Sequence, residues 1–186
     1  MNKKSIAYAI LAIVIIILTI NTLLYIIVSH IEKARDQASC QTSLSQIAKG
    51  LSIYQLDFGK QQLYPQKDGQ GFLLALYKTK ILIVKHIYTC GSTQDYEQQE
   101  QLENAPDNGD SDGPVSYAGR KNSQHNVYPG IFKPDIDTTT TPIVSDDFGA
   151  PYNHEDEATS ILFLDFHIDF KRKSDPDFPD LDVLTN

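Results

Sequence analysis

Basic residues are scarce in this 186-residue chain, which has 16 lysines and arginines against 24 acidic residues. Two of the basic residues and none of the acidic ones precede residue 30, so the rest of the chain carries a formal net charge of −10. A surface of this sign repels the phosphates of nucleic acids and anionic lipids. The charge balance therefore argues against nucleic acid as a partner and favours soluble cations.

The beginning of the chain lacks charge altogether, since residues 6–28, IAYAILAIVIIILTINTLLYIIV, include no acidic or basic side chain. A helix of this length reaches about 34 Å, and the hydrocarbon core of a bilayer is about 30 Å thick. A cleaved secretory signal has a shorter apolar region followed by a small-x-small site, and neither is present. We therefore predict that residues 1–29 are a transmembrane signal anchor held in the lipid bilayer.

Helix-breaking residues are missing from a longer stretch, because residues 6–58 contain no proline and Gly50 is their only glycine. One continuous helix of about 53 residues is the simplest prediction, with Gly59 as its C-terminal stop. After the apolar segment, apolar or small residues recur at steps of three and four, which is typical of an amphipathic helix. This stripe consists of Ile31, Ala34, Ala38, Leu44, Ile47, Ala48, Leu51, Tyr54 and Phe58. We expect residues 30–58 to continue the helix and to pack on a domain.

The remaining sequence is long enough for one domain with its own core. Asp68 is a candidate N-cap for a short amphipathic helix over residues 71–80. Segments rich in β-branched and aromatic residues predict strands. These segments are residues 81–90, 115–119 and 138–145, and an acidic loop over 92–114 separates the first two. We assign residues 30–174 to this domain and expect the Pro- and Asp-rich residues 175–186 to be an extended or frayed tail.

The stretch HEDEATSILFLDFHIDF, residues 154–170, allows two arrangements. A straight strand would place Asp165 and His167 on one face. A hairpin with a two-residue turn at Asp165-Phe166 would pair Leu164 with His167, and Phe166 would then need a positive φ at a cost of about 1–2 kcal/mol. The hairpin would gather a wholly apolar face from Ile161, Phe163, Ile168 and Phe170. The pattern alone leaves both arrangements open.

Five stretches, in this order along the chain, resemble a pilin-like family that is related to type II secretion pseudopilins and named for its C-terminal H-X9-D-G motif. They are ARDQASCQTSLSQIAKGLSIYQLDFGKQQLYP (34–65), IYTCGS (87–92), VSYAG (115–119), PIVSDD (142–147) and NHEDEATSILFLDFHIDF (153–170). The resemblance implies an α+β, type IV pilin-like fold, in which a long N-terminal helix is first transmembrane, then amphipathic, and packs on an antiparallel sheet.

The family motif falls on His154, Asp165, Phe166 and His167, which favours the hairpin. Ten residues instead of nine separate His154 from Asp165, and Phe166 replaces the turn glycine, so a distorted or bulged hairpin is expected. The family's processing signature includes a glycine at the cleavage point and a glutamate inside the apolar helix. This chain has no glycine before Gly50 and no acid in the span, which argues against prepilin-peptidase cleavage.

The resemblance implies a non-enzymatic, membrane-anchored structural or assembly protein of a secretion or filament system. Its partners would be other pilin-like subunits or secretion-system components. The anchor would cross the cytoplasmic (inner) membrane once, with the C-terminal domain in the periplasm or outside the cell. The alternative is an anchored binding module that takes up calcium or contacts an envelope partner.

Several residues could bind metal, and each of them also has a structural explanation. His154, Asp165 and His167 could ligate a metal with Asp146 or Asp147, although a hydrogen-bonded turn is the favoured explanation for Asp165. A second candidate is the start of a calcium loop, but the glutamate expected at its twelfth position is a glycine. This candidate consists of Asn108, Asp110 and Asp112. No arrangement of residues predicts nucleophilic catalysis, and calcium is the single cofactor considered.

The two cysteines, Cys40 and Cys90, are compatible with a disulfide in an exported domain. Closing a loop of about 50 residues would contribute on the order of 4 kcal/mol. The alternative is a pair of buried free thiols.

Overall fold

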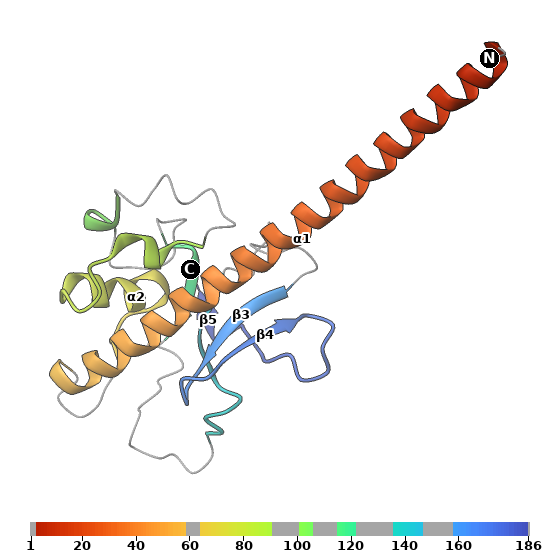
Figure 1. Cartoon of the computed structure of the whole chain (residues 1–186). Helices are drawn as coiled ribbons and strands as arrows, with labels where there is room; N and C mark the ends of the chain where they lie inside the picture. Colours follow the sequence, from red (N-terminus) through yellow and green to blue (C-terminus); the bar gives the residue numbers. More distant parts are fainter. Residues whose placement is uncertain are drawn as a thin grey trace. The chain divides into compact units, whose positions relative to one another are not determined.

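The computed structural model describes residues 3–58, 64–90, 101–105, 115–121, 136–146 and 158–185. The chain divides into two compact units, Met1–Arg35 and Asp36–Asn186. The fold is α+β, as predicted, with helices and antiparallel strands (Figure 1). The elements are α1 (Lys3–Asp57), α2 (Gly69–Lys78), the short 3-10 helix η1 (Lys85–Tyr88), β1 (Tyr117–Arg120), β2 (Pro142–Asp146), β3 (Ala158–Phe163), β4 (Ile168–Arg172) and β5 (Leu184–Thr185).

Helix α1 is one uninterrupted helix of 55 residues, which confirms the prediction from the lack of proline and glycine. In the first compact unit of the chain, the apolar side chains of α1 from Leu11 to Val28 are exposed. Contiguous apolar surface of this extent is unfavourable in water. Of the described helices, α1 alone is long and apolar enough to cross a membrane, a property that a signal sequence near an N-terminus shares.

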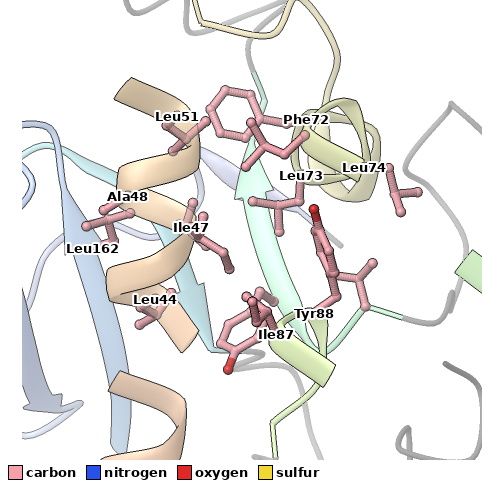
Figure 2. Packing of buried hydrophobic residues seen from close by; sticks show 14 of the residues in the cluster. Leu44, Ile47, Ala48, Leu51, Phe72, Leu73, Leu74, Ile87, Tyr88 and Leu162 are labelled. Atoms are coloured by element: carbon pink, nitrogen blue, oxygen red, sulfur yellow. The ribbon is translucent and has the colours of Figure 1, made fainter. Parts of the chain in front are cut away.

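In the second unit, α1 packs between the sheet and α2 along its stretch from Cys40 to Leu51. Figure 2 shows Ala48 of α1 beside Leu162 of β3, and Leu51 directed toward Phe72 of α2. The predicted stripe is buried only where these elements cover the helix. Its outlying members are exposed, and the prediction was wrong for them: Ile31, Ala34, Ala38 and Phe58.

The sheet has the strand order β4-β3-β2-β1-β5, and all neighbouring pairs are antiparallel. Side chains alternate between its faces, so Leu162 joins the core with α1 while Ile161 and Phe163 point away from it. The opposite face is covered by Leu181 and Leu184 near the C-terminus. The tail was expected to be extended or frayed, and it is not frayed: these apolar residues fold back onto the sheet and the extended β5 pairs with β1.

The strand predicted over residues 81–90 is absent. These residues form a turn followed by η1, in which Ile87 and Tyr88 are buried and the Tyr88 hydroxyl donates to the Leu82 carbonyl at 2.8 Å. β-branched and aromatic residues favour any half-buried surface, and they form a strand only beside a partner strand. Here the segment packs against the helices instead.

Helix α2 lies close to β1 because glycines face each other at the contact. A Cβ atom added to Gly119 of β1 would lie 2.2 Å from the Gly69 carbonyl oxygen. Asp68 occupies the N-cap position of α2, as predicted, but makes no side-chain capping hydrogen bond. Its backbone instead forms an isolated antiparallel bridge with Lys121, next to the end of β1.

Candidate functional site

Asp165, Phe166 and His167 lie in the hairpin that connects β3 and β4, which confirms the hairpin arrangement. The Phe163 N–H donates to the His167 carbonyl at 3.0 Å, and the Phe166 N–H donates to the Phe163 carbonyl at 2.9 Å. Three residues therefore form the loop, and the last of them, Phe166, has a φ of 68°. This is the left-handed position that usually takes glycine in three-residue hairpin loops.

The register of the hairpin differs by one residue from the two-residue turn that we predicted. Leu162 pairs with Ile168, and Ile161 pairs with Asp169. A shift of one residue moves each side chain of one strand to the other face relative to its partner. The predicted apolar face, which required Ile161 and Ile168 on the same side, was therefore wrong, and β3 contributes to both faces of the sheet.

Asp165 and His167 satisfy each other at the tip of the hairpin. The His167 N–H donates to Asp165 Oδ1 at 3.2 Å, and His167 Nδ1 lies 2.5 Å from the same oxygen. The imidazole also stacks on the Phe163 ring, with 4.4 Å between the centroids. Both polar side chains remain partly exposed, at 32% for Asp165 and 42% for His167. These contacts are those of a hydrogen-bonded turn.

The Phe166 side chain packs against the hydrophobic core and so anchors the loop. Its ring meets the Tyr64 ring edge-on at 6.4 Å between centroids, and Tyr64 in turn contacts Phe72 of α2. Aromatic pairs in this geometry contribute about 0.5–1.5 kcal/mol beyond the area they bury. This packing explains how a bulky residue is held at a positive φ.

Asp146 is the last residue of β2 and lies beside the part of β3 that is farther from the hairpin loop. Pro142 of β2 pairs with Phe163 beside the turn, whereas Asp146 lies four residues further along and accepts a hydrogen bond from the Ser160 N–H at 3.3 Å. The structure therefore does not bring Asp146 together with Asp165 and His167. Five predicted ligands lie outside the described residues, and their metal roles stay predictions: Asn108, Asp110, Asp112, Asp147 and His154.

Cys40 of α1 and Cys90 after η1 form a disulfide with 5.3 Å between their Cα atoms. Both cysteines are buried, and the Asp146 carboxylate lies within 4.8 Å of their sulfurs. Among the described residues, no other three His, Cys, Asp or Glu side chains approach so closely. The thiolate is the form of cysteine that binds metals, so the disulfide withholds both sulfurs from any ion. No local pattern in the sequence predicted that Asp146 lies beside the cysteines, because contacts between segments far apart in the chain bring them together.

Two buried tyrosines stay protonated at ordinary pH, and one of them, Tyr117, pairs with Asp146 across β1 and β2. Burial raises the pKa of Tyr117, and the neighbouring charge of Asp146 raises it further. Burial also raises the pKa of Tyr64 to about 12. Neither phenol is suited to proton transfer near neutral pH, where a catalytic pKa has to lie close to the working pH.

Arg120 is a buried charged residue that the sequence did not reveal. Its side chain on β1 donates from Nη1 to the Pro142 carbonyl at 2.7 Å, linking β1 to the start of β2. Burial lowers the pKa of Arg120 to about 10, which leaves the guanidinium charged near neutral pH. An arginine at the end of a short strand has no local pattern that distinguishes a buried position from an exposed one.

Comparison with protein-family models, curated proteins and solved structures yields no match. The family resemblance therefore rests on the five sequence stretches.

The geometry that remains is that of a stabilised scaffold. The disulfide fixes α1 to the segment after η1, the hairpin loop is anchored by Phe166, and Asp165 is occupied by His167. Among the described residues, neither cysteine is a free thiol. The arrangement can present surfaces and resist unfolding.

Proposed function

We propose that this chain is a membrane-anchored, pilin-like subunit that acts by association in a secretion or filament assembly and has no catalytic role. The observation that carries the proposal is α1. Its part from Leu11 to Val28 exposes a charge-free apolar surface, and its part from Cys40 to Leu51 is built into the core of an α+β unit. A single helix that combines these two environments is suited to join a bilayer to a folded domain.

The folded unit supports the pilin-like assignment in its general plan. A helix packed on an antiparallel sheet, with a hairpin at the position of the family motif, is what the resemblance implies. Phe166 adopts the positive φ that the family's glycine would adopt freely. The motif therefore keeps its turn geometry in this chain although its glycine is replaced.

The disulfide supports a location outside the cytoplasm. Disulfides persist in oxidising compartments and are rare where cellular thiols keep cysteines reduced. Cys40 and Cys90 are buried and bonded to each other. We therefore place the second unit in the periplasm or outside the cell, with the apolar segment in the cytoplasmic membrane.

The lack of charge in residues 6–28 defines how such a subunit would associate. An ion pair between neighbouring helices needs an acidic or basic side chain within the span, and this span has none. Charged side chains are costly in lipid unless they are paired. Association through this segment would rely on packing and on uncharged hydrogen bonds, as suits an anchor or a minor component more than a major filament subunit.

Membrane fractionation of the full chain tests the proposal. We expect the wild type to remain in the membrane after alkaline extraction, with residues 6–28 still present by mass spectrometry, and to co-purify with pilin-like proteins. Ile17→Arg should release a substantial fraction, because a central arginine costs about 2.5–3.5 kcal/mol on insertion. Ile83→Arg is the matched control, since Ile83 is 63% exposed in the second unit and should leave anchoring unchanged. Loss of the apolar segment from the mature protein, or purification as a monomer without pilin-like partners, would contradict the proposal.

A further inference from the structure

Asn21 is the most polar side chain in the charge-free part of α1. Its Nδ2 donates to the Ile17 carbonyl at 2.9 Å. The hydroxyls of Thr19 and Thr22 likewise donate to carbonyls one turn earlier, at 2.8 and 2.9 Å. A hydroxyl has one proton to donate, whereas an amide has two protons and a carbonyl oxygen. Asn21 thus differs from both threonines in keeping a donor and an acceptor beyond its own helix bond.

These remaining groups need a partner in lipid. A polar group in hydrocarbon without a hydrogen bond costs several kcal/mol, and lipid chains supply none. Asparagine side chains in membrane helices therefore commonly bond across to a neighbouring helix. The Asn21 side chain is exposed, so it is accessible to such a neighbour.

Asn21 lies on a face with the spacing of a two-helix interface. Val14, Asn21 and Val28 are seven residues apart, and an apolar residue follows each of them three positions later. These following residues are Ile17, Leu24 and Ile31, and the five apolar members of the face are between 45% and 62% exposed. A single asparagine at the first position of such a repeat specifies the register and the oligomeric state of the paired helices. Because the other positions of the segment are apolar apart from Thr19 and Thr22, whose hydroxyls donate within the helix, the asparagine determines which face is used.

We propose that two copies of this chain pair in the membrane through this face, with the two Asn21 amides hydrogen-bonded to each other. Copies anchored in the same orientation are parallel, and a two-fold axis along the membrane normal places Asn21 at the same depth in both. An amide is complementary to itself, since each copy donates one N–H and accepts one. The inference rests on the proposed membrane anchoring and names a second copy as the partner.

Energy transfer between donor-labelled and acceptor-labelled full chains in lipid vesicles tests the pairing. We expect transfer that falls on dilution with lipid, and Asn21→Leu should raise the dissociation constant about 5- to 30-fold. Asn21→Gln, which keeps the amide, should retain most of the affinity. Thr22→Val, one position off the face, should change the constant less than about twofold. A monomeric wild type, an unchanged Asn21→Leu, or an equal loss in Thr22→Val would overturn the inference.

Cross-linking checks the register with Asn21 intact. Val28→Cys should form an intermolecular disulfide under mild oxidation, whereas Ser29→Cys, one position off the face, should not, because cysteines bridge only when their Cα atoms lie within about 7 Å. Equal cross-linking at both positions would overturn the assigned face. Vesicle flotation separates the two proposals: a chain that fails to float refutes the anchor itself, whereas one that floats without pairing refutes only the dimer.

Discussion

Replacing Gly119 by alanine is expected to destabilise the folded unit strongly, because β1 and α2 approach most closely at this residue. The new Cβ would lie 2.2 Å from the Gly69 carbonyl oxygen and 3.3 Å from Phe72 Cβ. Carbon and oxygen atoms without a bond between them normally stay about 3.3 Å apart or further. Either β1 or the first turn of α2 must therefore move by roughly 1 Å. Phe72 and Leu73, which follow this turn, are both buried in the core.

The cost can be bounded from two opposing effects. Overpacking a closely packed interior typically costs about 1–3 kcal/mol, and here the obstructing atom belongs to the backbone and cannot rotate away. Alanine also restricts the unfolded chain, which returns about 0.4–1 kcal/mol. We expect a net loss of about 2 kcal/mol in the free energy of unfolding, with little change in the denaturant dependence.

Urea unfolding of the full chain in detergent micelles, followed by circular dichroism, measures this loss. Gly50→Ala is the matched control, because Gly50 lies inside α1 and its added Cβ would meet Leu76 Cδ1 at 3.2 Å. That atom ends a side chain that can adjust, and alanine improves a helix interior by about 0.5–1 kcal/mol. The two substitutions should therefore have opposite signs. Gly119→Ala unfolding within about 0.5 kcal/mol of the wild type would refute the close approach of α2 to β1.

Three further outcomes follow from the second unit. Replacing Cys40 and Cys90 together by alanine should lower the free energy of unfolding in urea by about 4 kcal/mol, since the cysteines are 50 residues apart; a loss below about 1 kcal/mol would contradict a constraining cross-link. Hydrogen bonds from Lys171 to Asp177 and Asp169 raise the pKa of Lys171, and the bond to Lys171 lowers the pKa of Asp177. The contribution of these hydrogen bonds to the melting temperature should be lost as the pH falls below about 3.8, where Asp177 is protonated, and as it rises above about 10.5, where Lys171 loses its charge. Lys171→Met should remove the dependence of the melting temperature on pH in both ranges. Phe166→Val should unfold at least about 1 kcal/mol more easily than Phe166→Asn, because asparagine tolerates the φ of 68° and a β-branched residue does not; equal stabilities would contradict the turn geometry.

Local features of the sequence predicted the elements that local physics determines. The absence of proline and glycine predicted α1, Asp68 marked the start of α2, and the alternating segment over residues 160–170 predicted a strand, whereas the hairpin was favoured only by the family resemblance. The positive φ of Phe166 also followed from the sequence, because a tight turn at that position requires it. In each case the information lies within a few residues of the feature.

Features that depend on distant residues were missed or wrong. Residues 81–90 have the composition of a strand, but no strand in the described part of the chain pairs with them, and Lys85–Tyr88 form η1. The one-residue difference in hairpin register arises from loop length, which the sequence pattern did not settle. The cover of the second sheet face by Leu181 and the position of Asp146 beside the disulfide are contacts between segments far apart in the chain. Amino-acid composition does not predict which distant segments come into contact.

The disulfide also determines how the folded unit responds to mechanical load. Cys40 is the first buried residue of α1 among those whose side chains are described. A pull transmitted along α1 from its N-terminal end reaches a covalent bond before it reaches the apolar contacts of Leu44 and Ile47. Separating Cys40 from the segment after η1 would require rupture of that bond, so a pull on the N-terminal part of α1 cannot draw the helix away from that segment.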